Sequence, residues 1–155
     1  MLQLITLQMG QYCIGFDLKK VVKVIAAQSI LQLHEKSAFV EGLIDFQGEI
    51  IAVINMYQRL NIVSKNEISL TDKFIVLETG IRKIAFRVDD VLNVITVDAV
   101  DAENNVQVCP GARFVSMLKA NEKLIYIYDS ETLLSTTELI DIENIIHLNH
   151  SNYVV

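Results

Sequence analysis

Apolar and polar residues form their clearest pattern between positions 41 and 60. An apolar run at 42–46, interrupted by one acid, is followed by a polar turn at 47–49 and an unbroken apolar run at 50–54. Because glycine readily adopts a left-handed backbone, the Gln-Gly-Glu turn predicts a tight hairpin between two strands. Residues 56–60 then place apolar side chains four positions apart, which suits one helical turn against a sheet. The stretch therefore predicts strand, turn, strand and short helix.

The chain carries an internal repeat. Residues 3–25 align without a gap on residues 73–95, at a spacing of 70 positions. The paired positions include two glycines and two phenylalanines: Gly10 with Gly80, and Phe16 with Phe86. In each copy an apolar strand runs to a glycine turn, a second strand returns, and a short charged turn precedes a third strand. Such self-similarity indicates that one supersecondary unit occurs twice.

The opening unit recurs as well, because residues 50–55 align on residues 124–129 at a spacing of 74 positions. The change in spacing from 70 to 74 is what a difference in loop length produces. Two matches in the same order predict a duplicated fold. Strands at this spacing, turned by glycines, indicate an all-β barrel or sandwich, and no stretch before Ser135 keeps a helical period long enough for a crossover helix.

A helix is predicted near the C-terminal end of the sequence. Ser135 or Thr136 can cap it, Glu138 lies in its first turn, and the apolar residues that follow fall on one face. These expectations give three parts within a single domain over residues 1–155: two duplicated halves at about 1–70 and 71–134, each a small barrel of about five strands, and a helix at about 135–147.

Composition narrows the classes of function. Of the 155 residues 52% are hydrophobic, yet no apolar run approaches the roughly 18 residues of a membrane-spanning helix, so no membrane insertion is expected. The net charge of −6, without a cluster of Lys and Arg, disfavours nucleic-acid binding. The first residues lack the basic region of a secretory signal, and two cysteines, Cys13 and Cys109, make no disulfide framework. We therefore expect reduced thiols in a cytoplasmic protein, with Cys13 as a small core residue.

Catalytic motifs are absent from the sequence, which has no P-loop, GxGxxG, GxSxG or HExxH. His147 and His150 have HxxH spacing, but a zinc site needs further ligands, and no cluster supplies them. His34 is expected in a loop. The adjacent acids Asp89 and Asp90 suit a solvated turn or a helix cap better than general acid–base catalysis. The residues thus predict a protein-binding module without catalytic residues, metal or cofactor.

Residues 39–57, FVEGLIDFQGEIIAVINMY, resemble the pattern FIxGxxNLRGxIxPVxDLxxxL of the CheW family of chemotaxis coupling proteins. A second family motif, a strand, a glycine and a strand running into Val-Asp, matches residues 75–91, and the family's opening strand matches residues 15–21. The resemblance extends over about residues 4–134. It implies two five-stranded SH3-like barrels with a hydrophobic seam between them.

Members of that family are adaptors. In them one barrel binds the regulatory domain of the histidine kinase CheA, and a groove near the barrel junction takes the cytoplasmic hairpin tip of a chemoreceptor. The resemblance implies the same two partners, no cofactor, and a cytoplasmic location at membrane receptor arrays. It also implies that five positions line the receptor-facing groove: Val21, Lys23, Gly42, Gln47 and Gly48. Kinase contacts are expected on exposed strand edges of one barrel.

The motif departs from the family pattern at several positions: Gln47 replaces arginine, Asp45 replaces asparagine, Ala52 replaces proline and Asn55 replaces an acid. Losing an arginine and gaining an acid makes the local charge more negative. An auxiliary scaffold of a chemosensory pathway other than chemotaxis is therefore an alternative hypothesis. A small-ligand-binding β-barrel that uses the seam is another. For Val21 the alternative role is core packing, and for the two glycines it is backbone geometry.

Overall fold

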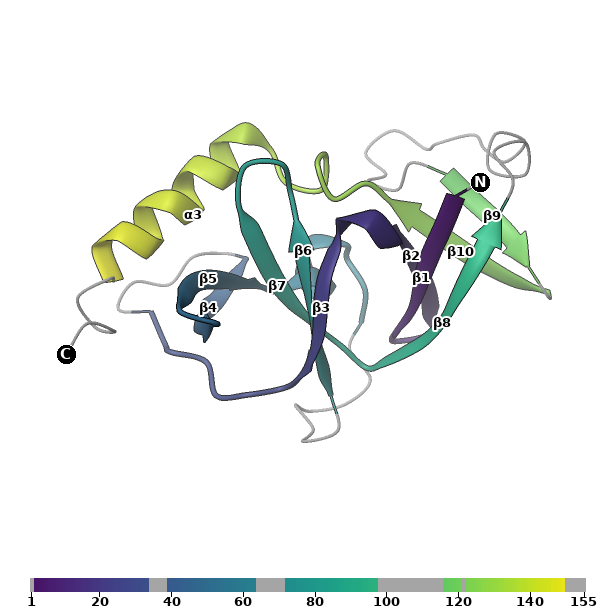
Figure 1. The fold of residues 1–155 in the computed structure, drawn as a ribbon, viewed down its shortest axis with the longest axis horizontal. Coiled ribbons are helices and arrows are strands. Elements are labelled where there is room, and N and C mark those ends of the chain that lie inside the picture. Colours follow the sequence, from purple (N-terminus) through teal and green to yellow (C-terminus); the bar gives the residue numbers. More distant parts are fainter. Residues whose placement is uncertain (1, 34–38, 64–71, 98–115, 121, 150–155) are drawn as a thin grey trace.

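The computed structural model describes residues 2–33, 39–63, 72–97, 116–120 and 122–149. The strands assigned within them are β1 Leu2–Met9, β2 Tyr12–Asp17, β3 Val21–Ala26, β4 Val40–Phe46, β5 Glu49–Ile54, β6 Lys73–Glu78, β7 Lys83–Val88, β8 Asp90–Val97, β9 Ser116–Ala120 and β10 Lys123–Tyr128 (Figure 1). The helical elements are the 3₁₀ turn η1 Leu18–Lys20 and the helices α1 Met56–Arg59 and α3 Thr136–Asn149. The all-β class, the short helical turns and the C-terminal helix are confirmed.

The strands form two five-stranded sheets, each curved into an SH3-like barrel. Barrel A has the strand order β8-β1-β2-β10-β9, and barrel B has the order β3-β6-β7-β5-β4. One neighbouring pair in each barrel is parallel, β2 with β10 and β7 with β5. In barrel B the chain after β3 returns to the edge strand β4, where Leu31 pairs with Leu43.

The strand orders correct one expectation, because neither barrel is built from one contiguous half of the chain. Strands β1 and β2 join β8, β9 and β10, whereas β6 and β7 join β3, β4 and β5. The halves at about 1–70 and 71–134 thus exchange their first two strands. Apolar periodicity identifies the strands, but the two copies have the same periodicity. The pattern therefore does not show whether a strand pairs with a strand of its own copy or with the equivalent strand of the other copy.

The two barrels have the same pairing register, and in each a strand of one copy pairs with a strand of the other. Two equivalent pairs show it: Leu7 with Val91 in barrel A, and Leu77 with Val21 in barrel B. The equivalent residues Phe16 and Phe86 meet between the barrels, with their ring centroids 5.6 Å apart. Reciprocal contacts of this kind are what an internal two-fold relation produces. The duplication is therefore present in the pairing as well as in the sequence.

Both faces of the central strands are buried, because one face lines a barrel and the other faces the seam. Along β6, Phe74 and Val76 belong to the interior of barrel B, whereas Ile75 and Leu77 belong to the central cluster. That cluster joins both barrels and α3: Leu7, Phe16, Phe86, Tyr128, Leu139 and Ile142 are among its members. Each large side chain buried there stabilises the fold by about 1.5–3 kcal/mol relative to exposure. The seam therefore holds the two barrels together as one unit.

Helix α3 starts with a reciprocal cap and packs on barrel B. The Glu138 amide donates to Ser135 Oγ at 3.1 Å, and the Ser135 amide donates to Glu138 Oε1 at 2.9 Å. This arrangement satisfies two amides at the helix start. The apolar face of the helix, Leu139, Ile142 and Ile146, is buried in the central cluster. No helix in the described part of the chain is long and apolar enough to cross a membrane.

Candidate functional site

The turn between β4 and β5 has the predicted hairpin geometry. Gln47 and Gly48 both have positive φ, 53° and 84°, as a two-residue turn of this handedness requires. The Asp45 side chain supports the turn, because its Oδ1 accepts a hydrogen bond from the Gly48 amide at 2.8 Å. Asparagine, the usual residue of the family pattern, can accept the same bond, so the change to Asp45 preserves the turn. The side chain of Gln47 is exposed beside it.

Strand β3 presents the other two predicted side chains. Val21 is partly buried and packs against the central cluster, whereas Lys23 is exposed. Between them Val22 keeps 42% of its surface exposed. The strand starts directly after η1, where Asp17 accepts a hydrogen bond from the Lys19 amide at 3.0 Å and so orients the entry to β3. This edge of barrel B is therefore a mixed apolar and basic surface.

Gly42 lies on β4 and is buried beneath the chain that follows β3. A Cβ atom at this position would lie 2.3 Å from Ile30 Cγ2 and 2.3 Å from the Leu31 carbonyl oxygen, closer than atoms can approach. Glycine is therefore needed for the close passage of this segment over β4. Its role is to shape the barrel edge, which agrees with the alternative of backbone geometry.

The register shows how these positions relate. Following the pairs across barrel B, Lys23 is level with Val76, Ala85, Val53 and Gly42. Lys23 and Gly42 thus lie at one height on the two edge strands, whereas the turn at 47–48 extends past the last pair of β4 and β5. All five predicted residues lie on barrel B, in two groups: the β3–β4 edges and the hairpin tip.

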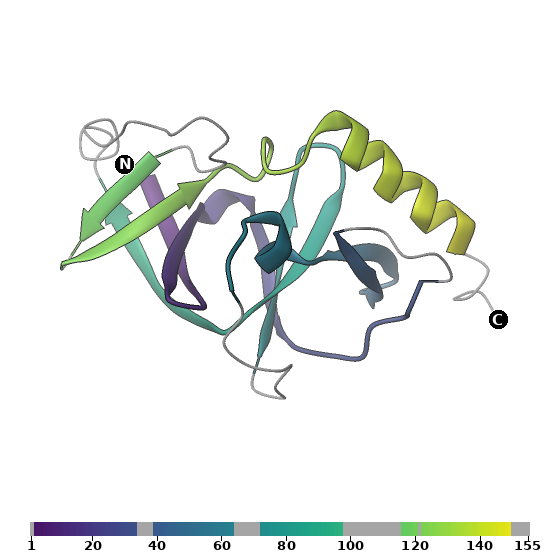
Figure 2. The same ribbon diagram turned by 180° about the vertical axis from the view of Figure 1, so that it is seen from behind.

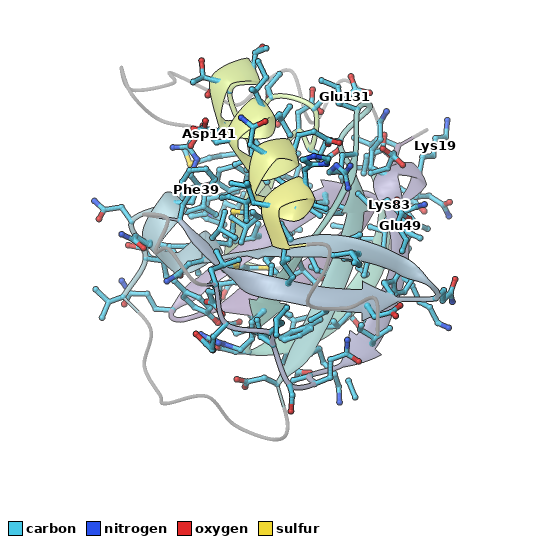
Figure 3. The ribbon with its side chains drawn as sticks, turned by 90° about the vertical axis from the view of Figure 1, so that its left-hand side faces the viewer. Lys19, Phe39, Glu49, Lys83, Glu131 and Asp141 are labelled. Atoms are coloured by element: carbon cyan, nitrogen blue, oxygen red, sulfur yellow. The ribbon has the colours of Figure 1, made fainter. Side chains whose placement is uncertain are left out.

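Charges around β4 and β7 are compensated within the chain. Arg87 lies 3.4 Å from a Glu41 carboxylate oxygen and 3.5 Å from one of Asp72, and its guanidinium stands 5.8 Å from the centre of the Tyr57 ring. Burial raises the pKa of Glu41, against the lowering effect of Arg87. At the hairpin, Lys83 Nζ contacts Glu49 Oε2 at 2.9 Å, a pair visible in Figure 3. Lys23 is thus the candidate residue that offers an exposed cation.

Asp89 corrects another expectation. It lies neither in a solvated turn nor at a helix cap, because its Oδ2 accepts a hydrogen bond from the Gly10 amide at 2.8 Å and its Oδ1 accepts one from the Tyr57 hydroxyl. The carboxylate therefore joins the β1–β2 turn of barrel A to α1 of barrel B. Burial is the main cause that raises the pKa of Tyr57, and the hydrogen bond to Asp89 is the second. A link between residues so far apart leaves no local pattern by which the sequence could reveal it.

Groups suited to metal binding or nucleophilic chemistry are scarce in the described residues, where no three His, Cys, Asp or Glu side chains gather. Cys13 is a buried free thiol, as expected, and burial raises its pKa. His147 lies in the last turn of α3. His34, Cys109 and His150 lie outside the described residues.

The small-ligand hypothesis can be compared with the cavities. The seam it invoked is filled, since Phe16 and Phe86 are completely buried there. A cavity of about 180 Å³ lies instead in barrel A, lined by Thr6, Cys13, Leu92, Asn93, Ile95, Ala120, Lys123 and Ile125. Its Thr6 hydroxyl already donates to the Asn93 carbonyl at 3.0 Å. The lining is mainly apolar and does not present the convergent polar groups that fix a small ligand.

Comparison with known proteins identifies the family and the fold. A CheW-like domain matches residues 3–138. The chain belongs to the CheW-like domain family. Chemotaxis protein CheW of Treponema pallidum (strain Nichols) is 25% identical over 149 residues, covering 92% of this chain and 88% of that protein. Chemotaxis protein CheW of Thermotoga maritima is 28% identical over 134 residues, covering 85% and 87%.

A solved structure agrees with both the fold and the family. The scaffolding protein TtCheW from Thermoanaerobacter tengcongensis superposes with a TM-score of 0.78 at 25% identity, over 88% of this chain and 90% of that one. The CheW-like resemblance and the two-barrel architecture are confirmed. At the level of the family, the chain is a scaffold or adaptor of the chemotaxis type. This agrees with the expected non-catalytic role.

Proposed function

We propose that this protein couples the cytoplasmic tip of a chemoreceptor to the regulatory domain of a CheA-type histidine kinase. The observation that carries the proposal is the CheW-like domain over residues 3–138, folded here as two complete barrels. An adaptor needs two separate partner surfaces on a rigid body, and the filled seam supplies that rigidity. No cofactor takes part in this role, and the protein acts in the cytoplasm, held at receptor arrays by its partners.

The receptor surface lies on barrel B. A receptor tip is a helical hairpin, so its recognition is of the helix-in-groove kind. Lys23 and Gln47 supply exposed polar side chains, and Val21 with Val22 supplies apolar area at the edge of β3. Gly42 and Gly48 set the backbone of β4 and of the hairpin rather than touching the partner through side chains. The kinase surface uses exposed strand edges of one barrel, and its residues are not assigned.

The hairpin also favours the alternative of an auxiliary scaffold with another choice of partner. Gln47 occupies the place of the family arginine, and a neutral amide cannot form the bidentate, charge-assisted contact that a guanidinium forms. Asp45 beside it adds a negative charge that is already engaged with the Gly48 amide. A receptor that suits this turn is therefore expected to present a neutral polar group to Gln47.

Binding of immobilised chain to a receptor hairpin fragment and to a CheA regulatory domain tests the proposal. We expect both to bind, and Lys23→Glu to weaken receptor binding at least ten-fold, about 1.4 kcal/mol, while kinase binding is unchanged. Lys123→Glu, which changes an exposed lysine on barrel A, is the matched control and should bind both partners normally. A folded chain that binds neither partner would contradict the adaptor function. Receptor binding that appears only in Gln47→Arg would favour the auxiliary scaffold.

A further inference from the structure

The outer surface of barrel A has a cluster of apolar and aromatic side chains over β2, β10 and β9. We call it the open face, and its residues are Tyr12, Met117, Lys119, Leu124 and Tyr126. The register places Leu124 opposite Lys119 and Tyr126 opposite Met117, so these four side chains are cross-strand neighbours on one face. The rings of Tyr12 and Tyr126 meet edge to face, with centroids 5.6 Å apart. Leu124 is 49% exposed, and the tyrosines and Met117 are partly exposed.

The internal repeat identifies an equivalent face on barrel B. Subtracting 74 from the β9 and β10 positions, and adding 70 to the β2 position, gives Leu43, Asp45, Ile50, Ala52 and Arg82. The pairings agree, since Leu43 lies opposite Ala52 and Asp45 opposite Ile50. The two faces therefore have the same backbone framework, and their difference lies in what covers them.

On barrel B α3 covers part of the equivalent face, whereas Asp45 at the hairpin is exposed. Leu43 and Ala52 are completely buried, and both belong with Ile142 to the central cluster. Arg82 makes a two-pronged ion pair with Glu143, at 2.5 and 2.7 Å. A second pair, Arg59 with Glu138 at 2.5 Å, anchors the first turn of the helix. This framework thus binds an amphipathic helix through an apolar stripe and acidic side chains that meet cations on the barrel.

The same helix cannot cover the open face. Figures 1 and 2 show α3 extending away from β9 and β10, at the opposite end of the molecule. Nor is the α3 of a second copy available, because its own apolar stripe is buried in its own barrel B and held by two ion pairs. Among the described residues the open face also has an exposed cation, Lys119, next to its apolar side chains.

We propose that the open face docks an amphipathic helix of a partner protein, with an apolar stripe at helical spacing and an acidic flank. The apolar stripe covers Leu124, Met117 and the two tyrosines, and an acid of the helix pairs with Lys119. The proposal goes beyond the coupling function above and uses a different barrel from the receptor surface. It depends on the repeat and on charge complementarity, not on the identity of the receptor or the kinase.

The probe for this surface is a peptide of residues 135–149, the helix that covers the equivalent face. A short peptide is only marginally helical alone, so a cross-link replaces Ile140 and Asn144, which are exposed in the folded chain. Titration into ¹⁵N-labelled full chain should shift amides of β2, β9 and β10. A control peptide with Leu139, Ile142 and Ile146 changed to serine should leave them unmoved.

Variants of the chain make the test quantitative. Leu124→Glu should weaken peptide binding about ten-fold or more, since it places a charge beneath the apolar stripe, and Lys119→Glu should weaken it by a smaller factor that shrinks at high salt. Ile140→Glu is the matched control, because Ile140 is 55% exposed on α3, which packs on barrel B. This variant should bind the peptide as the wild type does.

Three outcomes would overturn the proposal. The β2, β9 and β10 amides could stay unmoved at saturating peptide, or shifts could be confined to β4 and β5, which would mean displacement of the resident helix. A dimer in sedimentation that Leu124→Glu abolishes would assign the open face to a second copy instead. The coupling function is tested separately by Lys23→Glu, so failure of one proposal leaves the other intact.

Discussion

Barrel A and barrel B share strand order and register, yet they differ inside and outside. Inside barrel B, Phe46 and Phe74 are part of a buried cluster. The repeat places Ala120 and Leu4 at the equivalent positions of barrel A, where a cavity of about 180 Å³ remains and Ala120 lines it. Outside, α3 covers barrel B, and the open face of barrel A is without such a helix in the described residues.

The difference shows which properties of a duplicated fold are shared and which diverge. Backbone pairing is common to both barrels because it depends on the alternation of apolar residues, which both copies keep. Side-chain volume and surface polarity differ, because they act locally and need not match between copies. Barrel B has become the packed and covered half, and barrel A has kept an exposed surface. A matched pair of substitutions, one in each barrel, can therefore measure each difference.

The largest effects are expected where the two copies meet. Phe16 and Phe86 are both completely buried and contact each other across the seam. Phe16→Ala and Phe86→Ala should each lower the free energy of unfolding by about 3–5 kcal/mol, because each leaves a cavity as well as losing buried area. Urea unfolding followed by circular dichroism measures both. A large cost for one and a small cost for the other would show that the seam is not shared equally.

A somewhat smaller effect is expected at the covered face. Ile142 lies on the apolar face of α3 and is completely buried, so Ile142→Ala should destabilise the fold by about 2–5 kcal/mol. Leu124→Ala on the open face changes a half-exposed side chain and should stay within about 0.5 kcal/mol. Thermal unfolding of the two variants side by side makes the comparison. Equal costs would mean that the open face is already covered in the isolated chain, contrary to our inference.

A small effect is expected at the ion pair between Arg82 and Glu143, which anchors α3. The hydrogen bond from Arg82 lowers the pKa of Glu143, and the charges of Arg82 and His147 lower it further. Ionised Glu143 therefore stabilises the fold at pH values above 4.5, its pKa in the unfolded chain. That contribution should be lost as the pH falls below 4.5, through the lower folded pKa. Because the Glu143 side chain is 56% exposed, Glu143→Gln should cost only about 0.2–1 kcal/mol at pH 7. Unfolding of both chains at pH 7 and in acid should show the difference vanish in acid; a constant difference would contradict this.

Much of the architecture could be predicted from local patterns. The hairpin at 47–48, the helical turn after β5 and the cap at Ser135 depend on residues close together in the sequence, whose backbone preferences act without help from the rest of the chain. The roles of the candidate residues on barrel B depend on their exposure, which local patterns do not determine. Lys23 and Gln47 are exposed, whereas Gly42 lies beneath the segment at 30–31. Exposure depends on what other segments cover, which a strand pattern does not show.

By itself the sequence determined that this chain is an all-β protein with a duplicated pattern and the motif of its family, since these follow from periodicity, glycine turns and residue order. Tertiary structure alone decided which copy supplies each strand, because the two copies have the same pattern and pairing is settled only when both are present. It also decided that Asp89 joins the two barrels and that α3 covers only one of them. Each of these depends on contacts between segments far apart in the chain, where packing selects among partners that local preference leaves equal.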